Sequence, residues 1–141
     1  MHAMKTIGRH LIAEFYECDG DVLDNVETVR AAMLDAAGAV GATVMGESFH
    51  RYAPQGVSGT ILIAESHLSV HTWPEAGYAA VDIYTCGGLD SRPGFRLLHE
   101  RLGAKSSRAQ EILRGVPEDL EQGRLLVPSD VTVSCGSVEP L

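Results

Sequence analysis

Apolar and polar residues recur with two different spacings along the first hundred residues, and these spacings predict the secondary structure. Alternating or β-branched runs predict strands at 7–17, 43–52, 57–64, 67–73 and 79–86. Apolar residues at helical spacing predict one helix that begins near Asp21 and Asp24 and ends at Gly38 and Gly41. A second helix is predicted at 93–102.

This order of elements predicts an α+β fold, a two-layer α/β sandwich with helices on one face of a mostly antiparallel sheet. The strand at 57–64 is almost continuously apolar, so we expect it to be central and covered on both faces. Strict alternation at 67–73 is expected to place His67, Ser69, His71 and Trp73 on one face of the sheet. Beyond residue 105 the pattern fades, and propensity favours a helix at 108–113 and a short strand at 131–133.

Length and charge limit the classes of function. A chain of 141 residues is expected to form one domain, 1–141, with a real core. The net charge of −8 argues against nucleic acid as a partner, because phosphate binding needs a basic face. No apolar run approaches the roughly 18 residues of a membrane span, and the start of the chain lacks the features of a secretory signal. We therefore expect a cytoplasmic protein without a membrane partner.

The three cysteines, Cys18, Cys86 and Cys135, are too widely spaced to predict a disulfide framework or a paired-cysteine zinc site. A metal site made of His67, His71 and Cys86 is conceivable, but no fourth ligand recurs at zinc-like spacing. No metal is therefore expected.

The segment 65–75, with the sequence ESHLSVHTWPE, carries the most specific chemistry. Ser66 directly follows Glu65 where two predicted strands meet, and His71 lies five residues further on. A hydroxyl beside its own peptide carbonyl, with a possible base nearby, is suited to attack the backbone instead of an external substrate.

The segments around this stretch complete a resemblance to a known family. They are residues 8–11, 14–18, 49–52, 56–59, 65–75, 78–82 and 84–87. In this order and spacing they resemble the small prokaryotic S-adenosylmethionine decarboxylases, which are zymogens that make their own pyruvoyl group. The resemblance covers roughly residues 5–104. Residues 105–115 depart from it because they contain little β-branching, and 116–141 form a divergent tail.

The resemblance implies a first reaction on the chain itself. The Ser66 hydroxyl would attack the Glu65 carbonyl, and elimination and hydrolysis would leave a β chain, 1–65, and an α chain, 66–141, that begins with pyruvate. The family assigns Ser58 to stabilising the tetrahedral intermediate. It assigns His71 to the base that drives elimination.

The second implied reaction is decarboxylation of S-adenosylmethionine, which supplies aminopropyl groups for spermidine and polyamine biosynthesis. The covalent pyruvate would form a Schiff base with the substrate, and Cys86 would donate the proton that replaces carbon dioxide. Tyr52 would stack on adenine or on the sulfonium, Trp73 would wall the pocket, and Glu75 would bind the ribose hydroxyls. Relatives are homodimers with sites shared between protomers, so we expect a four-layer dimer.

Two alternatives stay open at this point. One alternative to an S-adenosylmethionine decarboxylase is a pyruvoyl decarboxylase of the same fold that acts on arginine or ornithine. Tyr52, Trp73 and Glu75 favour the nucleoside, since a bare diamino acid needs neither a stacking ring nor a ribose acceptor. The other alternative is an uncleaved, inactive homologue that acts as a regulatory or dimerising partner.

Overall fold

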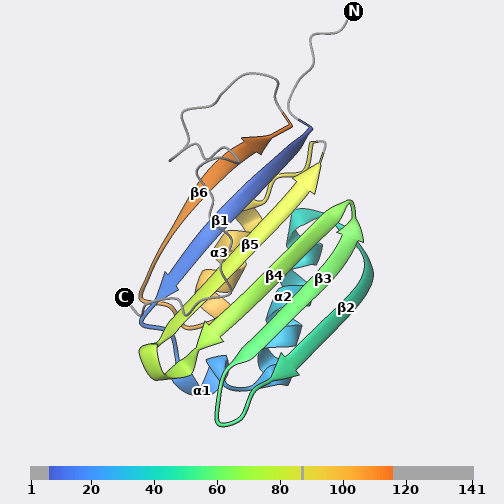
Figure 1. Ribbon diagram of the computed structural model, residues 1–141. Coiled ribbons are helices and arrows are strands. Elements are labelled where there is room, and N and C mark those ends of the chain that lie inside the picture. Colours follow the sequence, from blue (N-terminus) through green and yellow to red (C-terminus); the bar gives the residue numbers. More distant parts are fainter. Residues whose placement is uncertain (1–6, 87, 116–141) are drawn as a thin grey trace, which may run out of the picture.

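Six antiparallel strands form one sheet in the computed structural model, and helices cover one face of it (Figure 1). The structure describes residues 7–86 and 88–115. Its elements are β1 (Gly8–Tyr16), α1 (Gly20–Leu23), α2 (Val26–Val40), β2 (Thr43–Arg51), β3 (Val57–Ala64), β4 (Ser66–Trp73), the 3₁₀ turn η1 (Pro74–Ala76), β5 (Tyr78–Cys86), α3 (Arg92–Arg101) and β6 (Ser106–Arg114). The strand order is β2-β3-β4-β5-β1-β6. The predicted two-layer α+β arrangement is confirmed.

The core lies between the sheet and helices α2 and α3. Every second residue of the inner strands points into it, as the alternation at 67–73 predicted. Helix α2 adds one apolar face, and the buried core side chains include Phe15, Met33, Ile61, Leu68, Ile83 and Leu98. Fully burying a side chain of this size stabilises the fold by about 1.5–3 kcal/mol relative to leaving it exposed. This layer supports the sheet beneath its opposite face.

The single helix predicted after the first strand is two helices. Asp19 caps α1, and Asn25 caps α2 by accepting a 3.0 Å hydrogen bond from the Thr28 N–H. Asp24 lies between the two helices, and its carboxylate binds the connection between β2 and β3. It accepts hydrogen bonds from the Gly56 N–H (2.9 Å) and from Arg51 Nη2 (2.8 Å).

The helix predicted at 108–113 was wrong, since these residues belong to strand β6. This strand pairs with β1 along its whole length, from Tyr16 opposite Ser106 to Gly8 opposite Arg114. Without β6, the outer edge of β1 would present unpaired N–H and C=O groups. Pairing with that edge outweighs the local helix propensity of the segment.

The expectation that strand 57–64 is covered on both faces was also wrong for the single chain. In β3, Thr60, Leu62 and Ala64 are exposed, and Leu62 is 56% exposed. All the described helices pack on the other face. The strand predicted at 131–133 lies outside the described residues. No helix among the described residues is long and apolar enough to cross a bilayer.

Candidate active site

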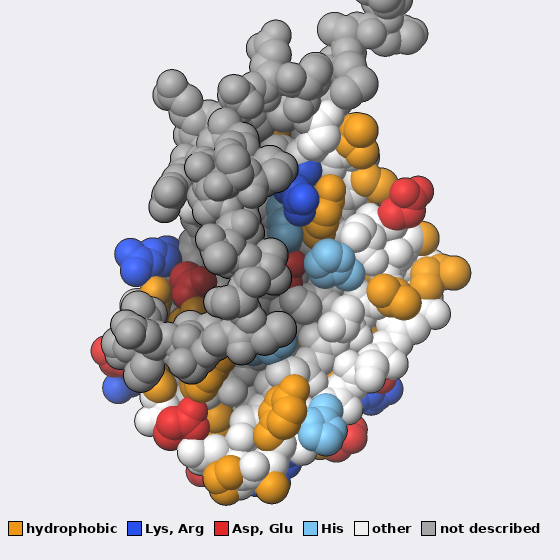
Figure 2. Space-filling view, viewed as in Figure 1, with side chains coloured by type: hydrophobic (Ala, Val, Ile, Leu, Met, Phe, Trp, Pro, Cys, Tyr) orange, Lys and Arg blue, Asp and Glu red, His pale blue; other side chains and the backbone are white. Residues whose placement is uncertain are grey.

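The face of the sheet that the helices leave open carries the polar side chains singled out from the sequence. Figure 2 views the molecule from this side and shows histidines distributed over it. An open hollow in this face is lined by His10, Ile12, Glu14, Ser69, His71, Ala80, Val81 and Asp82. We refer to this side of the sheet as the open face.

The junction predicted to be cleaved lies at one end of the open face. Glu65 is an exposed one-residue turn between β3 and β4, and Ser66 begins β4. The carbonyl oxygen of Glu65 accepts a hydrogen bond from the backbone N–H of Cys86, at 3.3 Å. The structure therefore places the carbonyl that would be attacked next to Cys86, although the two residues are far apart in the sequence.

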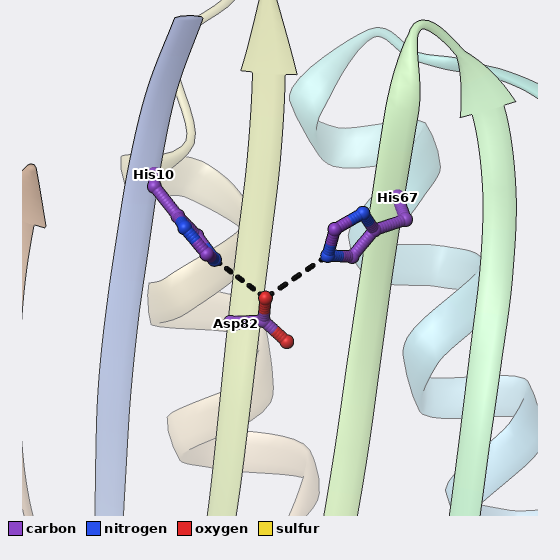
Figure 3. Close-up of side chains that lie close together, drawn as sticks. All are labelled: His10, His67 and Asp82. Atoms are coloured by element: carbon purple, nitrogen blue, oxygen red, sulfur yellow. Dashed lines mark hydrogen bonds and ion pairs between the residues drawn. The ribbon is translucent and has the colours of Figure 1, made fainter. Parts of the chain in front are cut away.

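The Ser66 hydroxyl begins a chain of hydrogen bonds along the open face. Its Oγ lies 3.0 Å from Nδ1 of His67, and Nε2 of His67 lies 3.1 Å from Oδ2 of Asp82. The same carboxylate oxygen is 2.5 Å from Nε2 of His10, and Ser69 donates to the other oxygen. Figure 3 shows both imidazoles pointing at Asp82, one from β1 and one from β4.

Asp82 is held in its ionised form. Burial raises the pKa of its carboxyl, but the hydrogen bonds from Ser69, His10 and His67 outweigh burial and leave the pKa below its ordinary value. The carboxylate is therefore a permanent acceptor for the groups around it.

A second hydrogen-bonded pair lies further along the sheet. Ser58 and His71 are direct partners across β3 and β4, and Ser58 Oγ lies 2.7 Å from Nδ1 of His71. Five residues of extended strand separate His71 from Ser66, which is about 16 Å at 3.3 Å per residue. Within one chain, His71 is therefore not near Ser66, contrary to the expectation from sequence proximity.

The three predicted substrate-binding residues lie at the same end as the Ser58–His71 pair. Tyr52 is 48% exposed and directly follows β2, and Trp73 is 44% exposed at the end of β4. The Trp73 ring stacks on Tyr78 with centroids 5.3 Å apart. Glu75 lies in η1 and accepts a 2.6 Å hydrogen bond from Gln55. The predicted site residues of one chain thus form two groups at opposite ends of the sheet, and we refer to these groups as the two half-sites.

The sequence interpretation did not identify the roles of His10, His67 and Asp82. The alternation at 67–73 placed His67 on one face with His71, but it gave no information on Asp82 or His10. What was missing was the register that sets β4 and β1 on either side of β5, with His67 opposite Tyr84 and Ile12 opposite Asp82.

His10, His67 and Asp82 are also the one group among the described residues with the composition of a metal site, since their ligand atoms lie within 4.8 Å of one another. Of the three metal candidates considered from the sequence, His67 belongs to this group, and His71 and Cys86 do not. Cys18 and Cys86 are free thiols. Cys135 lies outside the described residues.

Comparisons with known proteins agree with one another. The family model described as S-adenosylmethionine decarboxylase matches residues 9–115. An S-adenosylmethionine decarboxylase proenzyme from Thermosipho africanus is 51% identical over 118 residues, covering 83% of this chain and 91% of the relative. One from Thermotoga maritima is 50% identical over 123 residues, covering 82% and 95%.

Among solved structures, the crystal structure of the adenosylmethionine decarboxylase from Aquifex aeolicus is similar. It superposes with a TM-score of 0.74 at 34% identity, over 84% of this chain and 99% of the other. The family match extends through β6, so the departure expected at 105–115 was wrong.

Proposed function

The chain belongs to the S-adenosylmethionine decarboxylase family, and we propose on this premise that it is a proenzyme that cleaves itself between Glu65 and Ser66. It is a carboxy-lyase that converts S-adenosylmethionine to its decarboxylated form and carbon dioxide. In the proposal, the products of self-cleavage are a β chain, 1–65, and an α chain, 66–141, whose pyruvoyl group derives from Ser66.

The hydrogen bond from the Cys86 N–H to the Glu65 carbonyl is the observation that carries the cleavage proposal. When the Ser66 hydroxyl attacks this carbonyl, the oxygen becomes negatively charged. A backbone N–H already aimed at that oxygen stabilises the developing charge without reorganisation. The residues at the junction thus fit a serine-derived pyruvoyl group.

The separation of the two half-sites supports a homodimer with shared active sites. If two open faces pack together with their strands running in opposite directions, the Ser66 end of one protomer meets the Ser58–His71 end of the other. The isologous contact of a two-fold dimer generates two such sites. The result is a four-layer assembly, helices–sheet–sheet–helices, that also covers Leu62.

In this arrangement, Ser58 and His71 of the partner subunit complete the processing machinery. Ser58 donates to the tetrahedral oxygen, and His71 removes the proton that allows elimination.

The pyruvoyl group supplies a ketone that binds the substrate amine and accepts the electron pair left when carbon dioxide departs. Cys86, whose backbone N–H bonds the Glu65 carbonyl, donates the proton to the substrate carbon. Tyr52 and Trp73 of the partner subunit offer exposed rings to the adenine and the sulfonium, each cation–ring contact contributing about 0.5–2 kcal/mol. Glu75 accepts hydrogen bonds from the ribose. We place the enzyme in the cytoplasm, in the supply of aminopropyl groups for polyamines.

The choice of substrate is supported by the relatives, which carry the name of S-adenosylmethionine decarboxylase. An enzyme for arginine or ornithine would have no use for Tyr52, Trp73 and Glu75 as a nucleoside pocket. Release of carbon dioxide from the three substrates, assayed side by side, tests this choice. Release from arginine or ornithine instead of S-adenosylmethionine would contradict it.

Intact mass spectrometry tests self-cleavage. Wild-type protein should give fragments of 65 and 76 residues, and the larger one should lack an N-terminal amine and form an adduct with borohydride and substrate. Ser66→Ala should remain one chain of 141 residues without activity. A wild-type chain that stays whole after long incubation would favour an inactive regulatory partner.

A further inference from the structure

We propose that His67 is the general base that removes the proton from the Ser66 hydroxyl in the self-cleavage reaction, and that Asp82 and His10 position it. This inference rests on the proposed function, because it names the group that starts the cleavage. It assigns a step that His71 of the same chain cannot perform, since about 16 Å of strand separates His71 from Ser66.

The hydrogen bonds determine which nitrogen of each imidazole carries the proton. Arg114 Nη1 lies 3.2 Å from Nδ1 of His10, and an arginine can only donate. Nδ1 of His10 is therefore an acceptor, and its Nε2–H donates to Asp82. The guanidinium of Arg114 also lies 5.0 Å from the centroid of the Tyr84 ring, and that ring stacks on His10 at 4.8 Å. Two hydrogen bonds and one stacked ring thus fix the orientation of the His10 imidazole.

Asp82 also determines which nitrogen of His67 carries the hydrogen. Its ionised carboxylate can only accept, so Nε2 of His67 must carry a hydrogen. In the neutral imidazole the other nitrogen, Nδ1, then bears the free lone pair. That nitrogen is the one 3.0 Å from Ser66 Oγ, so the hydroxyl donates to it. The serine proton is already directed at a group able to accept it.

The proton and electrons of the attack can be followed atom by atom. The Ser66 O–H bond breaks, its proton moves to Nδ1 of His67, and Oγ forms a bond to the carbonyl carbon of Glu65. The π electrons of the carbonyl move to its oxygen, which the Cys86 N–H holds. When the carbonyl re-forms, the bond to the Ser66 nitrogen breaks, and that nitrogen takes the proton back from His67. The product is an ester with a free amine, and no external reactant is needed.

The arrangement is that of a serine, a histidine and an aspartate in hydrogen-bonded series, in which the carboxylate orients the imidazole. Here the serine attacks its own preceding carbonyl. The half-burial of the group fits this task, since His67 is 33% exposed and Asp82 22% exposed at the side chain. The triad therefore remains accessible until a partner protomer covers the open face.

The same three side chains have the composition of a metal site, and the hydrogen bonds decide between the two interpretations. Oδ2 of Asp82 accepts from two imidazoles and Oδ1 from Ser69, so its lone pairs are directed at donors. A divalent cation would require both Nε2 atoms to lose their hydrogens. His10 would then need its proton on Nδ1, where the Arg114 donor is.

The first experiment follows cleavage of freshly refolded chains by intact mass. His67→Ala should cleave about 10²–10⁴-fold more slowly than wild type, the usual contribution of a general base, and added imidazole should restore part of the rate. His99→Asn is the matched control, because this histidine also has a serine partner but lies far from the junction. Its Nδ1 lies 2.7 Å from the Ser107 hydroxyl. This variant should cleave at the wild-type rate.

The second experiment locates the blocked step with hydroxylamine, which cleaves esters but not amides. His71→Ala should accumulate ester and be cut by hydroxylamine, whereas His67→Ala should resist it because the ester does not form. If His67→Ala does not fold, as judged by its melting curve, His67→Gln keeps a side chain of similar length without a basic nitrogen and should show the same resistance.

The positioning role has its own test. Asp82→Asn should slow ester formation, because an amide can present a donor to His67 and no longer fixes Nδ1 as the acceptor. Asp82→Glu should recover more of the rate than Asp82→Asn at an equal melting temperature.

Several results would overturn the inference while leaving the proposed function intact. They are wild-type cleavage rates in His67→Ala or His67→Gln, hydroxylamine cutting of these variants, and loss of wild-type cleavage on chelation with recovery on adding zinc. Failure of the wild type itself to cleave would instead contradict the proposed function.

Discussion

At the scale of single residues, Cys86 offers two groups to two different reactions. Its backbone N–H binds the Glu65 carbonyl, and its thiol is the proposed proton donor in decarboxylation. A substitution changes only the second group, because every residue but proline keeps the N–H. The two reactions of this enzyme should therefore respond differently to changes at this position.

Cys86→Ala should cleave within a few-fold of the wild-type rate and decarboxylate about 10²-fold more slowly or worse, since it has lost a positioned acid. Misplaced protonation should also convert the pyruvoyl group to alanine during turnover, and the α chain should change in mass accordingly. Intact mass and carbon dioxide release measure the two reactions on one sample. Normal turnover in Cys86→Ala would remove the thiol from the proton-donor role, and failure to cleave would show that the thiol acts in processing.

Cys18 illustrates a thiol that should stay unreactive. Burial raises the pKa of the Cys18 thiol to about 11, so almost none of it is thiolate at pH 8. Alkylation by iodoacetamide at that pH should be roughly a hundredfold slower in the folded protein than in denaturant, because the thiolate is the nucleophile. Mass mapping of the peptide that contains Cys18 measures this. Equal rates in both conditions would mean that the segment after β1 opens readily.

At the residue scale, the resemblance to the family pointed to Ser58 and His71 but not to His67. Ser58 and His71 were both assigned to processing, and the structure pairs them at 2.7 Å. The His67 contact depends on Asp82 and His10, which lie on two other strands. Such a contact requires the strand register, and alternation alone does not supply that.

At the scale of elements, Asp24 ties the junction of α1 and α2 to the connection between β2 and β3. Besides the carboxylate contacts, its carbonyl accepts from Nε of Arg51 at 3.1 Å. The hydrogen bonds from Arg51 and Gly56 lower the pKa of the Asp24 carboxyl. Folding thus favours the charged form, so this stabilisation is present above the pKa of the unfolded chain and is lost as the pH falls through the folded-state pKa.

Asp24→Asn should lower the melting temperature by a few degrees at neutral pH, because the amide cannot form the charged contact with Arg51. The difference from wild type should shrink as the pH is lowered into the range where the carboxylate of the folded protein takes up its proton. Thermal melts of both proteins over a pH series measure this, with Asp21→Asn as a surface control. A difference that is constant with pH would show that the charge of Asp24 contributes nothing.

The strands also show where the sequence pattern predicts secondary structure and where it does not. Strands β1, β4 and β5 followed their alternation, because each has one face on the core and one on the open face. Strand β6 did not, because it lies at the edge of the sheet and its side chains are mostly exposed. The hydrophobic pattern reflects burial of side chains. It therefore does not predict a strand that is held chiefly by backbone hydrogen bonds to its neighbour.

At the scale of the whole molecule, no described helix covers the open face of the sheet. This face carries charged and aromatic groups that the proposed mechanism uses, together with exposed Leu62. The apolar run at 57–64 was predicted to be covered on both faces, and in the proposed dimer the partner supplies the missing cover. The sequence pattern of a single chain does not indicate which surface would cover this face. The dimer was therefore predicted from the resemblance to the family and not from the pattern.

Complementation between two inactive variants tests the shared site directly. Ser66→Ala keeps a functional Ser58–His71 end but cannot be cleaved, and His71→Ala keeps Ser66 but lacks the base for elimination. A heterodimer of the two has one site with both residues and one with neither. Co-expression with random pairing should therefore allow about half of the His71→Ala chains to cleave, as read from intact mass. In the control, His71→Ala is co-expressed with the double variant Ser66→Ala/His71→Ala, in which no heterodimer has a complete site. If His71→Ala chains cleave in neither mixture, each chain completes its own site. The distance of about 16 Å between Ser66 and His71 would then have to close by movement within one protomer.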